Sequence, residues 1–151
     1  MVASAARASA RFELQPTLED VVRVCGALRP LMPARLPEED RYAIEIAMTE
    51  ALTNLVEHGY EGRPDAAPAR IKWLETDDLL LVEVRDEGRP IPRDVLARAG
   101  PDTFGYDPTD IGSLPESGMG LALMKAAFDD LDYRSENGTN VLTLRKRICP
   151  A

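Results

Sequence analysis

Hydrophobic and polar residues alternate in five short segments of the chain, and this period of two predicts five β-strands. The polar link Thr76-Asp77-Asp78 between the second and third segments predicts a hairpin. Asn137-Gly138 between the last two is a strong signal for a tight hairpin turn. The predicted strands cover residues 11–15, 71–73, 80–84, 132–136 and 141–146.

Apolar residues at helical spacing predict helices between these strands. The first helix follows Thr17, a suitable N-cap residue, and Pro30 and Pro33 end it. The second begins near Pro37, carries acidic residues in its first turn where the helix dipole favours them, and ends near His58. Two more are expected, a short helix over residues 93–99 and a longer one that Gly118 opens.

The order of these elements predicts an α+β fold. We expect a two-layer α/β sandwich, with a mixed sheet of about five strands and the helices on one face. A chain of 151 residues with 44% hydrophobic residues fits one domain with its own core, which we place at residues 11–148. Residues 1–10, rich in Ala and Ser, are expected to be a disordered tail.

The composition narrows the function. A formal net charge of −8 argues against nonspecific binding of nucleic acid, because such binding needs a basic surface. No apolar run reaches the roughly 18 residues of a membrane span, so we expect no membrane contact. Cys25 and Cys149 lie far apart and outside any metal-binding spacing, as reduced thiols of a cytoplasmic protein do.

Glu50 and Asn54 form the first candidate for chemistry. They lie one helical turn apart, at the margin of the apolar stripe of the second helix, so both can face a pocket. The amide oxygen of Asn54 suits a hard metal such as Mg²⁺, and the carboxylate of Glu50 could accept a proton from a hydroxyl. A solvated helix face explains the same pair.

Two glycine motifs are further candidates. Asp86-x-Gly88 directly follows a predicted strand, where the glycine permits a sharp turn and the carboxylate could bond the exocyclic amine of a purine; an ordinary turn explains it too. Gly118-Met119-Gly120-Leu121 opens a helix, where free N–H groups favour phosphate, although an ordinary helix start has the same sequence.

Residues 100–117 show no period, and so long a loop in a small domain is either functional or disordered. Between Ala99 and Met124 there is no Lys or Arg. A triphosphate near this segment would therefore need another source of positive charge: Mg²⁺, a helix N-terminus, Lys125 or a partner.

The order of the motifs is more specific than any one of them. It resembles the ATP-binding module of the gyrase, Hsp90, histidine-kinase and MutL type, and within it the anti-sigma-factor serine kinases. The resemblance covers residues 11–147. The stretches that carry it are EIAMTEALTNLVEHGY (45–60), VEVRDEGRPIP (82–92), ESGMGLALMKAAFDDLDY (116–133) and GTNVLTL (138–144).

The resemblance implies the histidine-kinase-like ATPase fold, with ATP and Mg²⁺ as cofactors. It makes Glu50 the general base, Asn54 the Mg²⁺ ligand and Asp86 the adenine anchor, with Thr139 supporting Asp86 through water. Residues 100–117 would cover the nucleotide. The remaining nucleotide-binding residues that it implies are Gly88, Ile91, Ser117, Gly118, Met119, Gly120 and Leu121.

The function implied by the resemblance is transfer of the γ-phosphoryl group to a serine of a small anti-sigma-factor antagonist protein. A sigma factor would be the competing partner, and a homodimer is expected on the same ground. One alternative is a regulatory module that binds nucleotide and a partner but transfers phosphate poorly or not at all. Another is an interaction protein that needs no nucleotide.

Overall fold

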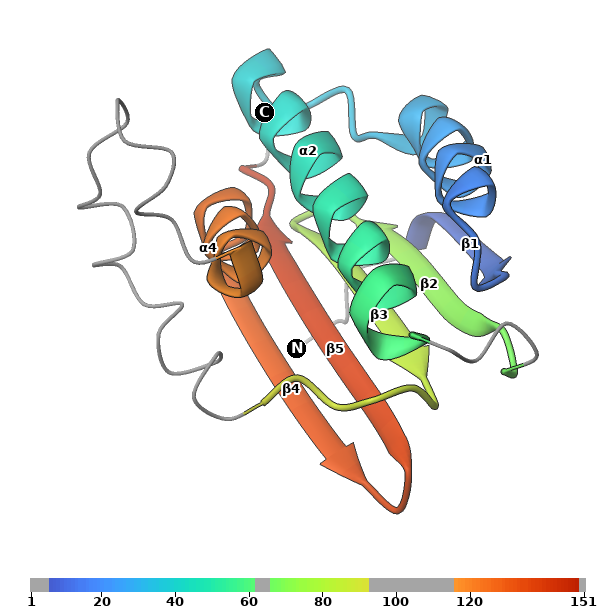
Figure 1. Ribbon diagram of the computed structural model, residues 1–151. Helices are drawn as coiled ribbons and strands as arrows, with labels where there is room; N and C mark the ends of the chain where they lie inside the picture. Colours follow the sequence, from blue (N-terminus) through green and yellow to red (C-terminus); the bar gives the residue numbers. More distant parts are fainter. Residues whose placement is uncertain (1–5, 62–65, 93–115, 150–151) are drawn as a thin grey trace.

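Five strands form one sheet, and all the described helices lie on one face of it in the computed structural model (Figure 1). The structure describes residues 6–61, 66–92 and 116–149, with the backbone alone for residues 116–120. The predicted two-layer α+β architecture is therefore confirmed. In the sheet order β1-β2-β3-β5-β4, the strands are β1 (Ala6–Leu14), β2 (Ala69–Thr76), β3 (Leu79–Asp86), β5 (Thr139–Arg147) and β4 (Asp130–Glu136).

Every pairing between the described strands is antiparallel, so the expectation of a mixed sheet was wrong. The connection from β3 to β4 includes α4 (Glu116–Ala127) and leaves these two strands running in the same direction. Parallel neighbours need such a long crossover. Here β5 lies between β3 and β4 and pairs with both, so the two strands never share a ladder.

The first strand begins at Ala6 instead of residue 11, which corrects the predicted tail for residues 6–10. These residues pair with β2, for example Ala10 with Trp73. The pairing uses backbone groups, which a run of Ala and Ser supplies as well as any other sequence. The hydrophobic pattern could not indicate this extension because Arg7 and the small Ala and Ser side chains do not mark an apolar face.

The helix starts follow the predicted caps. The hydroxyl of Thr17 accepts a hydrogen bond from the backbone N–H of Asp20 at 3.2 Å, and the Asp20 carboxylate accepts one from the N–H of Gln15 at 2.6 Å. Pro37 precedes the second helix, as expected. The helical elements in this part of the chain are α1 (Leu18–Leu28), the 3-10 turn η1 (Arg29–Leu31), α2 (Glu38–Asn54) and the π-helical turn η2 (Leu55–Gly59).

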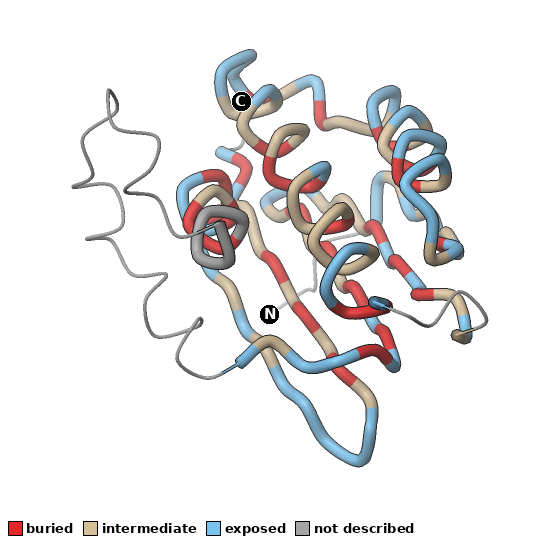
Figure 2. Tube along the Cα trace, viewed as in Figure 1, coloured by how far each residue is buried: buried red, intermediate tan, exposed pale blue. Residues whose placement is uncertain are grey.

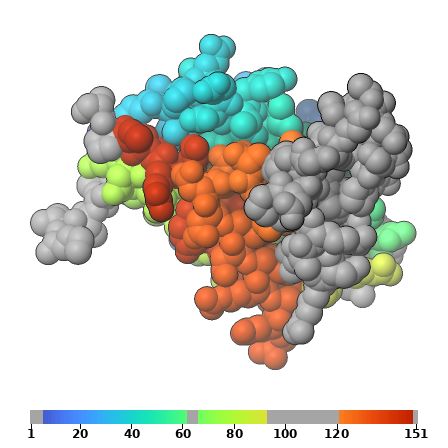
Figure 3. Space-filling view, turned by 90° about the vertical axis from the view of Figure 1, so that its left-hand side faces the viewer, coloured from blue at the N-terminus to red at the C-terminus, as the bar shows by residue number. Residues whose placement is uncertain are grey.

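The helix α4 begins at Glu116, two residues before Gly118, so the glycines lie inside its first two turns. Seen from the side, α4 and β4 form one continuous surface below the start of α2 (Figure 3). The short helix predicted over residues 93–99, and residues 100–115 of the predicted loop, lie outside the described residues.

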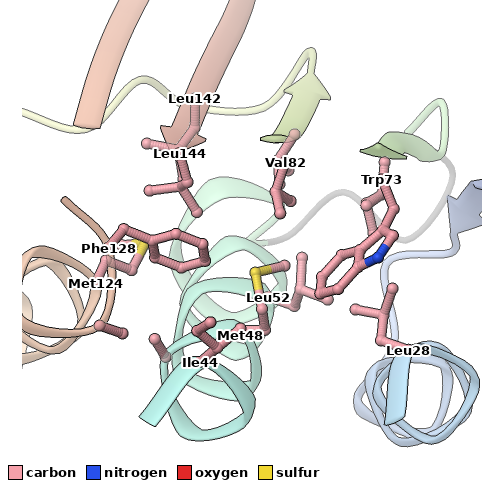
Figure 4. Close-up of a cluster of buried hydrophobic side chains, with 14 of the residues drawn as sticks. Leu28, Ile44, Met48, Leu52, Trp73, Val82, Met124, Phe128, Leu142 and Leu144 are labelled. Atoms are coloured by element: carbon pink, nitrogen blue, oxygen red, sulfur yellow. The ribbon is translucent and has the colours of Figure 1, made fainter. Parts of the chain in front are cut away.

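The buried residues that make up the core lie along the strands of the sheet and on the helices that cover it (Figure 2). Side chains of α2 occupy its middle, with Ile44, Met48 and Leu52 directed at the sheet (Figure 4). Phe128 contributes from the α4 side and Leu28 from α1 (Figure 4). No helix among the described residues is long and apolar enough to cross a membrane.

Candidate nucleotide-binding site

A cavity of about 300 Å³ lies at one end of the helix layer. Its walls come from the end of α2 and η2, from α4, from β4 and β5, and from β3 with the segment that follows it. Most of the lining side chains are apolar. They include Ala51, Leu55, Val84, Ile91, Leu121, Met124 and Leu142.

Asp86, the last residue of β3, is the buried acid of this cavity, with a residue exposure of 8%. Its Oδ1 accepts two hydrogen bonds, from the backbone N–H of Gly88 at 2.8 Å and from Nδ2 of Asn140 at 2.9 Å. Burial raises the pKa of Asp86, while these two bonds act in the opposite direction. No described residue donates to its Oδ2.

Asn140 lies directly opposite Asp86 in the β3–β5 ladder and is 1% exposed. Its Nδ2 also donates to the carbonyl of Gly88 at 2.9 Å, and its Oδ1 accepts from the hydroxyl of Ser135 at 2.7 Å. Thr139 precedes it in the strand and therefore points to the opposite face. The direct partner of Asp86 is thus Asn140, and Thr139 is not among the cavity-lining residues.

Gly88 allows two segments distant in the chain to touch. A Cβ at this position would lie 2.5 Å from the carbonyl oxygen of Gly59, at the end of η2. The next residue, Arg89, donates its backbone N–H to the same oxygen at 2.8 Å. The π-helical turn presents this carbonyl, because Tyr60 closes the wider turn by donating to Leu55. The turn after β3 is therefore attached to the end of α2.

Tyr133 of β4 fixes the far end of the same turn. Its hydroxyl accepts the backbone N–H of Ile91 at 2.9 Å, and both residues line the cavity. Burial raises the pKa of Tyr133 and that of Tyr60, the latter to about 12. Both phenols therefore stay protonated at neutral pH.

Glu50 and Asn54 lie where the helix pattern predicts, one turn apart near the end of α2. Both are half-buried, and neither side chain forms a hydrogen bond or ion pair with a described residue. Asn54 lines the cavity, whereas Glu50 does not. The structure thus brings Asn54 together with Asp86, Ile91 and Leu121.

Comparison with known proteins decides the family. Residues 14–146 match the model of the histidine kinase-like ATPase domain. The chain belongs to the histidine kinase-like ATPase family. Within this family it belongs with the anti-sigma-factor kinases: it is 33% identical to an anti-sigma F factor of Clostridium beijerinckii, over 68% of each chain. The resemblance found in the sequence is confirmed.

Two further relatives support this place in the ATPase family. A serine-protein kinase RsbW of Bacillus pumilus is 29% identical over 65% of this chain and 60% of its own length. The crystal structure of the RsbU and RsbW domains of a Mycobacterium tuberculosis protein matches 95% of this chain with a TM-score of 0.63 and 19% identity. That match covers 34% of the solved chain and shows the shared fold.

The cavity of this ATPase-family chain fits a nucleotide base. Its apolar walls suit a flat ring, and the free Oδ2 of Asp86 is an acceptor for an N–H donor. Among the described residues no group of three or more His, Cys, Asp or Glu could hold a metal alone. Mg²⁺ commonly uses one or two protein ligands together with phosphates, which fits the unpaired amide of Asn54.

Several cavity residues were not predicted from the sequence. Tyr133 and Gly59 line the cavity, and Asn140 lies behind it as the partner of Asp86. The pairing of β3, β5 and β4 brings Asn140 and Tyr133 into place, and the hydrogen bond from Arg89 brings Gly59 there. The alternation of β5 could have indicated Asn140, because it shares a strand face with the apolar residues. The predicted residues Ser117, Gly118, Met119 and Gly120 lie in the first turns of α4, where the structure describes the backbone alone.

Proposed function

We propose that this chain binds ATP with Mg²⁺ in the cytoplasm and transfers the γ-phosphoryl group to a serine of a small anti-sigma-factor antagonist. A sigma factor is the competing partner in this proposal. Support comes from relatives that are named serine-protein kinases and anti-sigma F factors. The chain spans 60% to 68% of the length of these two relatives, so their activity and partners belong to the proposal.

The observation that carries the proposal is the buried carboxylate of Asp86 in a mostly apolar cavity. Burying a charged group costs free energy unless a partner compensates it, so a buried acid with a free oxygen in a mostly apolar cavity points to a ligand. The matching ligand has a flat apolar ring that carries an N–H donor. Adenine has this combination.

The remaining residues have separate roles in the proposed reaction. The amide oxygen of Asn54 would hold Mg²⁺, and the free N–H groups of the first turn of α4 would face the phosphates. Glu50 would take the proton of the attacking serine as its oxygen bonds to the γ-phosphorus. The bond from that phosphorus to the bridging oxygen breaks, and ADP leaves. Positioning and charge neutralisation supply most of the acceleration in such reactions.

Calorimetric titration with ATP, with and without Mg²⁺, tests the binding step. We expect Mg²⁺-dependent binding in the wild-type protein and a loss of about 10- to 100-fold in Asp86→Asn, because a hydrogen bond to a charged group contributes about 1.5–3 kcal/mol. Thr143→Ala, on the opposite face of β5, is the matched control. Equal ATP affinity in Asp86→Asn would remove the adenine-anchor role.

The metal ligand needs its own variant. Asn54→Ala should weaken ATP binding in the presence of Mg²⁺ more than it weakens ADP binding without metal, because only the former uses the amide oxygen. The same titrations, run with both nucleotides, measure the difference. A uniform loss with and without metal would mean that Asn54 only shapes the cavity wall.

A second candidate function is a regulatory module that binds nucleotide without transferring phosphate. The position of Glu50 favours it, because this side chain does not line the cavity. Incubation with radiolabelled ATP and a candidate antagonist protein separates the two functions. Phosphoserine on the antagonist supports the kinase, and tight ATP binding without any transfer supports the module.

A further inference from the structure

The amide of Asn140 has every hydrogen-bonding group engaged inside the protein. One N–H points to Oδ1 of Asp86 and the other to the carbonyl of Gly88, both at 2.9 Å. The amide oxygen accepts from Ser135 at 2.7 Å. A backbone carbonyl can only accept, so the NH₂ group must be the end of the amide that faces Gly88 and Asp86. The amide orientation therefore follows from its neighbours.

This arrangement leaves Asn140 with no donor for a ligand. Of these two residues, only Asp86 can contact the base, and Asn140 determines the orientation of the Asp86 carboxylate. Two bonds hold Oδ1, from Gly88 and from Asn140, so rotation of the carboxylate would break both. Oδ2 is then fixed in one place as the acceptor for the ligand.

We propose that Asn140, held by Ser135, is a positioning residue that sets base selectivity in this site. The proposal rests on the proposed nucleotide-binding function and deepens it. A fixed Oδ2 accepts the exocyclic amine of adenine but meets the carbonyl oxygen that hypoxanthine carries at the same ring position. A carboxylate free to rotate could instead reach the neighbouring ring N–H of hypoxanthine. Fixing the carboxylate thus rejects the 6-oxo purines.

The burial pattern supports a positioning role for this pair. Asn140 is almost fully buried at the inner face of β5, whereas Ser135 is an exposed residue near the end of β4. A buried amide that lost one partner would leave a polar atom unsatisfied. Loss of one of the three hydrogen bonds should therefore weaken the other two. Ser135 can be changed without opening the core, which gives the test a mild variant.

The test compares the affinities for ATP and inosine triphosphate by calorimetry in the wild-type protein, Asn140→Leu and Ser135→Ala. We expect wild type to prefer ATP by about 100-fold, since sites built around a polar contact reject analogues that cannot make it. Asn140→Leu should lower the ATP-to-ITP ratio at least about tenfold, and Ser135→Ala about threefold. Thr143→Ala, on the other face of β5, is the control and should keep the wild-type ratio.

The ratio of ATP affinity to ITP affinity distinguishes a positioning role of Asn140 from a role in fold stability alone. If Asn140→Leu and Ser135→Ala bind both nucleotides more weakly by the same factor, Asn140 only stabilises the fold and the proposal is overturned. If Asn140→Leu does not fold, the ratio in Ser135→Ala alone decides, because its side chain lies at the surface. A wild-type protein that binds neither nucleotide overturns the proposed function as well. Binding of ATP with unchanged ratios overturns only the selectivity proposal.

Discussion

The two ends of the cavity differ in how their polar side chains are held. At the end formed by the sheet, Asp86 and its partner Asn140 each form hydrogen bonds with at least two residues. At the end formed by α2, Asn54 lines the cavity and Glu50 lies one turn before it, and neither side chain has a partner among the described residues. Hydrogen bonds within the protein fix the orientation of the polar side chains at the sheet end, whereas no described residue fixes those at the α2 end.

This difference suggests a division between recognition and chemistry. Recognition of a base gains from groups fixed before the ligand arrives, because less order has to be created on binding. A metal ligand and a proton acceptor must instead keep free lone pairs for the groups that they meet. The contrast leads to predictions about each end, from the largest expected effect to the smallest.

At the α2 end, Glu50→Gln should lower phosphoryl transfer by about 10²- to 10⁴-fold, the usual contribution of a general base. ATP affinity should stay within about twofold, because a general base would act only in the transition state. Single-turnover transfer and calorimetry measure the two quantities. Glu57→Gln, an exposed residue in η2, is the matched control. Transfer that survives in Glu50→Gln would assign the base to another group.

At the sheet end, Gly88→Ala should lower the free energy of unfolding by about 3 kcal/mol, as overpacking at a rigid contact does. Its Cβ would meet the Gly59 carbonyl, which cannot move without distorting η2. Urea denaturation measures the loss. Gly26→Ala, a helix position in α1 with no atom within 4 Å of the added carbon, should gain up to about 1 kcal/mol. Equal stability of the two variants would contradict the close contact.

The raised pKa of Asp86 predicts a pH dependence of stability. A folded-state pKa above the ordinary aspartate value of about 3.9 means that the folded protein holds this proton more tightly than the unfolded chain does. The free energy of unfolding therefore falls as Asp86 ionises, while the pH rises from below 3.9 through its folded-state pKa. Asp86→Asn lacks this cost, so its unfolding free energy should equal or exceed that of wild type at pH 7.

Urea denaturation of both proteins between pH 3 and pH 7 tests this sign. The difference between Asp86→Asn and wild type should grow with pH and then level off. A variant that becomes less stable relative to wild type as the pH rises would mean that the charged carboxylate stabilises the fold. The buried charge of Asp86 would then cost no stability, and its burial would not be evidence for a ligand at the sheet end of the cavity.

The smallest effect is expected for Thr139→Ala. Because its side chain lies on the face of β5 away from Asp86, ATP affinity should change by at most about twofold, within the usual range for such surface positions. Calorimetry beside Asn140→Leu makes the comparison direct. A larger loss in Thr139→Ala than in Asn140→Leu would restore the role that the sequence resemblance gave to Thr139.

Local chemistry made much of the fold predictable from the sequence. The Asn137-Gly138 turn takes positive φ angles of 53° and 80°, as the tight hairpin required, and Thr17 caps α1. The alternating pattern located four of the five strands well. The extension of β1 to Ala6 was missed, because Ala and Ser mark no face of a strand.

The candidate site was predictable only where one segment carries its own motif. Asn54, Asp86, Ile91 and Leu121 belong to recognisable stretches, and all four line the cavity. Side chains from different segments meet only after the strands pair. The partner of Asp86 depends on the register between β3 and β5, which joins residues 54 positions apart in the chain.

The sequence by itself determined which elements form, where their caps and turns lie, and which residues have functional groups suited to binding or catalysis. Each of these depends on neighbours within a few positions, whose torsions and hydrogen bonds are local. The tertiary structure decided the antiparallel sheet, the choice of Asn140 over Thr139, and the contact of Gly88 with Gly59. A strand shifted by one residue reverses every side chain, so only long-range pairing fixes which atoms meet.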